Sequence, residues 1–206
     1  LVLLTGRSIY PQPEQLEVKV LKVESAGLSR PFWLYIAAVA LIGAGYADFP
    51  LIAYHFKKVS TVPDTLIPVF YAVAMGVDTL AALIFGRLFD RTGISVLIFV
   101  SLLSSLFAPL VFLGGSFPAL AGTALWGVGI GAQESIMRAA VAGMVPADRR
   151  GTAYGVFNTG YGLLWFAGSV LMGVLYDISV LSLVVFSVLM QLASIPLLLM
   201  ARKELI

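Results

Sequence analysis

The chain has 206 residues, of which 60% are hydrophobic and only 12% are charged, and its formal net charge at pH 7 is +2. Soluble domains average about 45–50% apolar and about 25% charged residues, so this chain lacks the polar surface that a water-soluble fold needs. We therefore expect an integral membrane protein, and the small net charge gives no indication of nucleic-acid binding.

Several kinds of chemistry are excluded by residue type. The chain has no Cys, which excludes disulfides and thiol chemistry, and its one His, His55, cannot form a His-based metal site by itself. It has no Walker loop, so ATP is not expected to drive it directly. The glycines of "GVGIG" at Gly127 lie in an apolar run with no preceding strand, so they are not a nucleotide fingerprint. We expect no cofactor and no metal.

The first 30 residues precede the apolar core of the sequence. The run Leu1–Thr5, followed by Gly6 and Arg7, resembles the cytoplasmic end of an earlier membrane helix, and the chain has no initiator Met. Ser8–Ser29 is polar, with mixed charges and two prolines. We interpret residues 1–30 as the end of a preceding helix plus a cytoplasmic central linker, within a longer protein.

Apolar runs then follow one another along the chain. A membrane-crossing helix needs about 20 mainly apolar residues. Runs of that length cover residues 31–54, 65–86, 94–114, 117–144, 152–176 and 179–201. The sequence therefore predicts a six-helix transmembrane bundle over 31–201 and a cytoplasmic tail over 202–206.

Basic residues are distributed unevenly over the breaks between these runs. With six spans, ten Lys and Arg residues lie on one side of the membrane and only Lys57 and Lys58 lie on the other. Because cytoplasmic loops carry the excess of positive charge, the linker, the 85–93 and 147–151 breaks and the C-terminus are predicted to be cytoplasmic.

The two halves of the bundle resemble each other. "FGRLFDRTGISVLIF" from Phe85 and "MGVLYDISVLSLVVF" from Met172 share Gly-x-Leu-aromatic-Asp followed by an apolar run. "LIGAGYAD" and "LWGVGIGA" also correspond, as do "VPD" and "VPAD", and all offsets fall between 83 and 87 residues. An odd number of spans per repeat inverts the second copy. Inverted three-helix repeats are typical of secondary transporters.

One of these segments carries a family likeness. Residues 86–93, "GRLFDRTG", resemble the loop signature of the major facilitator superfamily, although Ile94 and Ser95 replace its terminal basic pair. "VPADRRGTAYGVFNTGYGLLWFAGSVLMGVLYD" is similar to the fourth loop and fifth helix of that family's C-terminal half. The likeness covers about residues 31–201. It implies an all-α integral membrane fold: six helices in two inverted repeats, forming half of a twelve-helix protein.

The resemblance also implies a gating role for the signature. Its Asp and Arg side chains latch the two bundles together on the cytoplasmic side, which here points to Asp90, Arg87 and Arg91, with Gly86 and Gly93 allowing close packing and the turn. Asp90 would accept charge-assisted hydrogen bonds near the start of the next helix. The alternative is a tight loop whose charges only fix topology.

Ionisable residues inside the spans are candidate functional residues, because burying one costs roughly 2.5–3.5 kcal/mol on insertion scales. Glu134 and Arg138 are one helical turn apart, so they can neutralise each other. Gln133 adds a hydrogen-bonding group beside them. We expect a substrate or proton site facing the central cavity, in which Arg138 releases Glu134 for protonation; a structural pair near the cytoplasmic end is the alternative.

Two further carboxylates lie in the first two spans. Asp78 has no cation nearby in sequence, and an unpaired carboxylate inside a span is what a proton carrier requires. The alternatives are a hydrogen bond to a neighbouring backbone or hydroxyl group, or pairing with Arg138. Asp48 lies nearer the outer face beside Pro50, which permits a bend; it is a gating residue or a residue of the cavity mouth.

A polar and aromatic stripe follows on the fifth span. Asn158, Tyr161 and Trp165 lie at helical spacing, with Tyr154 one turn earlier, and could bind an organic substrate or simply pack helices together. The glycines of this span are expected to permit close helix approach. They are Gly151, Gly155, Gly160, Gly162 and Gly168.

These features together predict a secondary active transporter rather than an enzyme. It would move a small solute across the cytoplasmic membrane by alternating access, with H+ as the coupling ion, and would complete its site with an N-terminal half. The alternatives are a non-transporting membrane sensor or scaffold that retains the fold, a membrane enzyme, and a six-helix unit that dimerises. The sequence identifies neither the substrate nor the direction of transport.

Overall fold

The computed structural model describes residues 27–205, and within that range the chain forms helices and no strands. The helices are α2 (Arg30–Ala44), α3 (Phe49–Val59), α4 (Ile67–Thr92), α5 (Ser95–Ser104), α6 (Phe107–Leu113), α7 (Ser116–Met144), α8 (Arg150–Ile178) and α9 (Val180–Leu205). Two 3-10 turns, η2 (Asp64–Leu66) and η3 (Ala147–Arg149), precede α4 and α8. The predicted all-helical class is confirmed for the described part of the chain.

Five segments are long and apolar enough to cross a membrane. They are Arg30–Val59, Asp64–Thr92, Ser95–Leu113, Ala147–Ile178 and Val180–Leu205. The expected multi-pass membrane protein is therefore confirmed. α7 has 29 residues but is not among the five, since its glycines and the Gln133–Glu134 pair lower its hydropathy. A sixth crossing by α7 stays a prediction.

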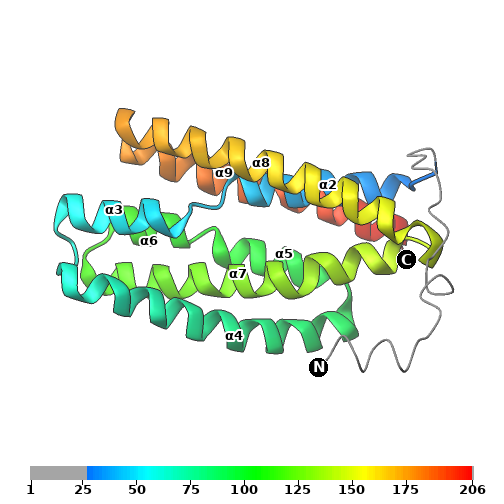
Figure 1. Ribbon diagram of the computed structural model, residues 1–206, viewed down its shortest axis with the longest axis horizontal. Coiled ribbons are helices and arrows are strands. Elements are labelled where there is room, and N and C mark those ends of the chain that lie inside the picture. Colours follow the sequence, from blue (N-terminus) through cyan, green and yellow to red (C-terminus); the bar gives the residue numbers. More distant parts are fainter. Residues whose placement is uncertain (1–26, 206) are drawn as a thin grey trace, which may run out of the picture.

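The helices lie along one common axis, and α7 runs through the middle of the bundle (Figure 1). α4 packs along α7 and runs in the same direction, while α5 and α6 also contact α7. α2 packs between α8 and α9, which run in opposite directions. Among the five membrane-length segments, those that contain α4 and α8 are the least buried.

The first predicted span is broken. α2 ends at Ala44 and α3 begins at Phe49, and in between the Tyr46 N–H donates to the Gly43 carbonyl at 3.1 Å. Pro50 lies in the first turn of α3, where its missing N–H costs nothing. The bend expected from Pro50 is thus a break over residues 45–48, which interrupts the regular backbone bonding between α2 and α3.

Two glycines bring α7 against α4. A Cβ at Gly127 or Gly131 would overlap the backbone of Ala74 or Asp78, respectively. Because glycine has no Cβ, the two helix backbones can approach this closely. Such close approach gives membrane helices van der Waals packing energy in lipid. The α4–α7 pair is therefore a tight unit.

The glycines of α8 behave less uniformly than the sequence analysis expected. Gly168 lies against the backbone of Ala44, and Gly160 lies near Ile36. Gly151, Gly155 and Gly162 have no neighbour within 4 Å in the described structure. The prediction of close helix approach holds for the first two and is wrong for the other three within this chain.

The outer faces of the bundle are apolar. Large hydrophobic side chains are exposed there, among them Leu80 at 62%, Phe117 at 82% and Phe166 at 69%. Monomeric soluble proteins rarely expose this much contiguous apolar surface. The faces suit a lipid environment.

Charge separates the two ends of the bundle. Arg30 begins α2 at the end where α4, α7 and α9 terminate, and its Nη1 lies 3.3 Å from Oε1 of Glu204. The other basic residues at this end are Arg87, Arg91, Arg149, Arg150, Arg202 and Lys203. Lys57 and Lys58 lie at the opposite end, in the last turn of α3. The three basic residues expected in the linker lie outside the described residues.

Several helices extend beyond the apolar runs that marked the predicted spans. The segment 85–93 is not a loop: α4 continues to Thr92, and only Gly93, with φ 62°, leaves the helix. The predicted tail over 202–206 is helical to Leu205. The physical reason is the same in both places, since charged residues leave the hydrocarbon but sustain helical hydrogen bonding.

Candidate functional site

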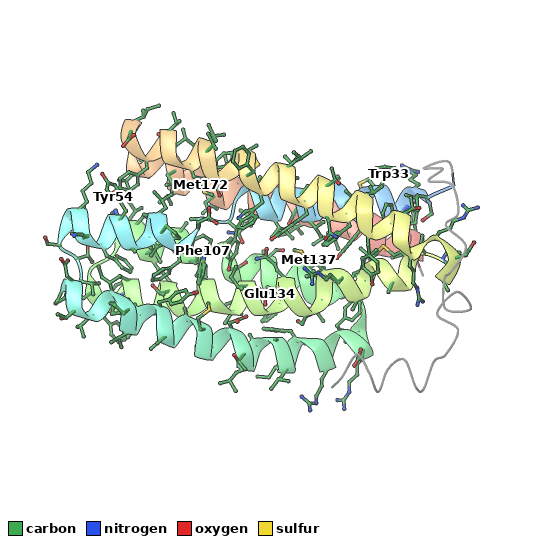
Figure 2. The ribbon with its side chains drawn as sticks, viewed as in Figure 1. Trp33, Tyr54, Phe107, Glu134, Met137 and Met172 are labelled. Carbon is green, nitrogen blue, oxygen red and sulfur yellow. The ribbon has the colours of Figure 1, made fainter. Side chains whose placement is uncertain are left out.

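A cavity of about 430 Å³ lies within the bundle, between the α2–α3 break, α4, α7 and α8. Figure 2 places two of its lining residues, Glu134 and Met137, midway between Tyr54 near one end and Trp33 near the other. The lining residues are Tyr46, Ala47, Asp48, Tyr71, Met75, Trp126, Ile130, Gln133, Glu134, Met137, Arg138, Phe157, Asn158, Tyr161 and Trp165.

Most of the residues singled out from sequence are brought together here. The cavity lining includes Asp48, Gln133, Glu134, Arg138, Asn158 and Trp165. They come from the α2–α3 break, α7 and α8, so only the fold makes them neighbours. Asp78 is the exception.

The α2–α3 break forms one end of the cavity and is held by cross-bundle hydrogen bonds. Trp126 Nε1 of α7 donates to the Ala47 carbonyl at 2.8 Å, and the Tyr46 hydroxyl donates to the Trp126 carbonyl. Ser169 of α8 donates its hydroxyl to the Asp48 carboxylate. The Trp126 bond satisfies a backbone carbonyl of the break, and the other two bonds tie the side chains of Tyr46 and Asp48 to α7 and α8.

α7 supplies the most polar wall. Gln133 is buried and its Oε1 accepts a hydrogen bond from the Tyr161 hydroxyl at 3.0 Å. Glu134 and Arg138 face the cavity, and both are exposed within this bundle. The Arg138 carbonyl accepts a hydrogen bond from the Tyr154 hydroxyl at 3.2 Å.

The expected Glu134–Arg138 ion pair is not formed. Over residues 27–205, the one salt bridge within 4.0 Å joins Arg30 and Glu204. Both Glu134 and Arg138 open onto the cavity, where water or solute can solvate them, so mutual neutralisation is not needed for them to be accommodated. The two charges are therefore available to a ligand.

α8 supplies an aromatic wall. The Tyr161 ring is stacked between Phe157 at 5.8 Å and Trp165 at 6.5 Å, measured between ring centroids. Asn158 lies on the same cavity-facing side. The stripe predicted from helical spacing thus contributes both to packing and to the cavity surface.

Asp78 lies outside the cavity lining. It is on α4, where the α7 backbone approaches at Gly131, and its Oδ1 is buried without a hydrogen-bond partner. The pairing with Arg138 that sequence left open is not formed among the described residues. The sequence analysis placed Asp78 on the cavity path because it lies near the middle of a span. A position along the helix does not by itself reveal which way the side chain faces.

The predicted gating residues are all on or next to the end of α4. Arg87, Asp90 and Arg91 are exposed and helical, and Gly93 caps the helix by donating its N–H to the Phe89 carbonyl at 2.8 Å. Gly86 has no neighbour within 4 Å. Asp90 therefore belongs to the last turn of one helix rather than to the start of the next.

Sequence reasoning missed several cavity residues, above all Tyr46, Tyr71 and Trp126. The signal available for Trp126 was its position two helical turns before Glu134 on the same helix. Tyr46 is marked only by its neighbours Gly45 and Asp48 in "AGYAD". Within the described part of the chain, no group of three or more His, Cys, Asp or Glu residues could hold a metal ion.

The chain is similar in sequence to known proteins. The family model described as Major Facilitator Superfamily matches residues 5–169. The uncharacterized protein Rv2265 of Mycobacterium tuberculosis and the uncharacterized protein Mb2288 of Mycobacterium bovis are each 35% identical over 191 residues. The match covers 90% of this chain and 47% of each relative, so the chain spans about half their length. No solved structure matches.

Proposed function

Since the chain belongs to the major facilitator superfamily, a family of membrane transporters, we propose that it forms one six-helix bundle of a secondary active transporter. The transporter moves a small solute across the cytoplasmic membrane by alternating access. The observation that carries the proposal is the cavity of about 430 Å³, which gathers the polar residues of otherwise apolar helices halfway along the bundle. Binding at the midplane is typical of such transporters.

A second bundle completes the site. The relatives are about twice as long as this chain, which leaves room for a second unit of equal size. Glu134, Arg138, Asn158 and Trp165 are exposed at the cavity in this bundle, so a facing bundle would enclose a solute against them. Rocking of one bundle against the other then exposes the solute to either side.

The internal symmetry supports the same scheme. α4 and α8 carry the repeated Gly-x-Leu-aromatic-Asp motif in their last two turns, and they run in opposite directions (Figure 1). An inverted repeat requires that relationship. The α2–α3 break lies at the cavity, as discontinuous helices do at transporter sites.

We assign the coupling proton to a carboxylate of the cavity. Glu134 lines the cavity without a salt bridge in the described structure, so an entering solute can alter its surroundings directly. Asp78 is the second candidate for the coupling proton. It lies at the α4–α7 contact, so it would relay a proton only when those two helices separate.

The charged end of α4 is assigned to gating and orientation. Arg87, Asp90 and Arg91 project from the last turns of α4 at the basic end of the bundle. This end is cytoplasmic by the positive-inside rule. There the three side chains can bond to the facing bundle or to lipid phosphates when the cytoplasmic side is closed.

The test is proton movement in liposomes that contain the full-length gene product, screened with sugars, organic acids and organic cations. The proposal expects proton movement that depends on one solute class and is abolished in Glu134→Gln. Asp78→Asn is measured beside it to separate the two carboxylates. Folded protein that moves neither solute nor protons across the panel would overturn the transporter and favour a sensor that retains the fold.

A further inference from the structure

The cavity also carries information about the chemical class of its solute. Six of its lining side chains are aromatic: Tyr46, Tyr71, Trp126, Phe157, Tyr161 and Trp165. Aromatic rings offer apolar surface and a negative face, and they recognise cations, above all those that are weakly hydrated. Aromatic surface alone fits any flat organic molecule, so the polar groups decide between classes.

Four hydrogen-bond donors in or beside the cavity are already used by the protein. The Tyr46 hydroxyl and the Trp126 indole N–H bond to backbone carbonyls. The Tyr161 hydroxyl bonds to Gln133, and the Ser169 hydroxyl bonds to Asp48. An anion would find these four donors occupied, whereas a cation needs none of them.

Two acidic acceptors along the cavity remain available. A carboxylate has about four lone-pair sites, and Asp48 uses one of them for Ser169. Glu134 opens onto the cavity and makes no salt bridge within the part of the chain that the structure describes. Two carboxylates therefore face the space that the aromatic side chains enclose.

The one cation of the lining lies at the other end. At a rise of 1.5 Å per residue, Glu134 lies about 12 Å along α7 from Trp126, and Arg138 lies about 18 Å from it. Trp126 marks the level of the α2–α3 break, because it bonds to Ala47. The stretch from Asp48 to Glu134 is thus acidic and aromatic, and the positive charge is confined to the far end.

We propose that the cavity binds an organic cation, with the charged nitrogen between Asp48 and Glu134 and its apolar part against the aromatic side chains. This inference rests on the proposed function, since it names the solute class of the same site. It adds that charge selectivity is set within this bundle.

Binding is measured by equilibrium dialysis of the purified full-length gene product in detergent, so the result does not depend on transport. The probes share one phenyl ring: benzyltrimethylammonium is the cation, benzyl alcohol is neutral and phenylacetate is the anion. We expect saturable binding of benzyltrimethylammonium and at least about tenfold weaker binding of the other two.

Variants then locate the site. Glu134→Gln and Asp48→Asn each lower the affinity for the cation by about tenfold, and Arg138→Gln raises it, because a nearby positive charge is removed. Trp165→Leu lowers the affinity, and Trp165→Phe restores part of it. Asp64→Asn is the matched control, because Asp64 is an exposed carboxylate in η2, away from the cavity.

Each outcome separates this inference from the proposed function. Cation binding that depends on Glu134 and Trp165 supports the inference, whatever the transport assay shows. Phenylacetate binding that is lost in Arg138→Gln overturns the inference and leaves the transporter proposal standing. Binding of the cation that is unchanged in all cavity variants, or no binding of the cation to folded protein, also overturns it.

Discussion

Trp126 of α7 and Ala47 of the α2–α3 break are joined by a hydrogen bond of 2.8 Å from the indole Nε1 to the backbone carbonyl. The bond fixes the α2–α3 break against α7, and the Tyr46 hydroxyl adds a second contact to the carbonyl of the same tryptophan. Both partners line the cavity. The cavity wall at the break is therefore held by hydrogen bonds between Trp126 and residues of the break, in a region where an unbroken helix would bond to itself.

Replacing Trp126 with Phe tests that role. The Ala47 carbonyl loses its donor while staying buried, which costs about 1–3 kcal/mol. We expect a lower midpoint of thermal unfolding in detergent than for Trp33→Phe, whose parent side chain is 46% exposed. Equal midpoints for the two variants would contradict the role given to this bond.

The α4–α7 contact makes a second prediction. Gly127→Ala places a Cβ against the backbone of Ala74, so the helices must separate, at a cost of about 1–3 kcal/mol. Gly143→Ala on the same helix has open space around it and is expected to be stabilising by about 0.5–1 kcal/mol, since Ala favours helix over Gly. The midpoints of thermal unfolding in detergent should fall for Gly127→Ala and rise for Gly143→Ala. A rise for Gly127→Ala would refute the tight contact.

Replacing Asp78 is expected to change stability and not binding, in contrast to replacing a carboxylate of the cavity. Its Oδ1 is buried without a partner, so Asp78→Ala relieves an unsatisfied polar atom and is expected to stabilise the folded protein by about 1 kcal/mol. Because Asp78 does not line the cavity, binding of benzyltrimethylammonium is expected to be unchanged. Unfolding and equilibrium dialysis measure the two effects. Loss of cation binding in a stable Asp78→Ala protein would place this residue in the site.

The orientation of the bundle is testable with single cysteines, because the 206 residues contain none. Ser60→Cys lies in the turn after α3, and Thr92→Cys lies in the last turn of α4, at the opposite end of the bundle. The excess of Arg and Lys beside Thr92 predicts that a membrane-impermeant maleimide labels Ser60→Cys in intact cells and labels Thr92→Cys only after lysis. The reverse pattern would invert the assignment.

Polarity within apolar helices made the cavity residues visible in sequence. Glu134, Arg138 and Asn158 are costly in lipid, and the fold places all three in the lining of one cavity. Asp78 shows the limit of that rule: it also avoids lipid, but it does so by lying against α7 at Gly131. Sequence reports that a polar side chain turns inward, not which interior surface it meets.

Helix ends and breaks were less accessible to sequence. Hydropathy marks the part of a helix inside the hydrocarbon, whereas α4 continues through Arg87 and Asp90 to Thr92. The break at residues 45–48 depends on partners more than 75 residues away, such as Trp126 and Ser169. The role of Tyr46 and Trp126 follows from that long-range bonding, which no local pattern encodes.

The most direct test of the central claim, that the cavity is the solute path, is the accessibility of one cavity position from both sides of the membrane. Asn158→Cys places a thiol on the cavity wall at the exposed side of α8. Alternating access predicts that an impermeant maleimide reaches it from either side of oriented vesicles, and that the transported solute protects it from both. A thiol that reacts from one side only, in protein that still transports, would contradict the account.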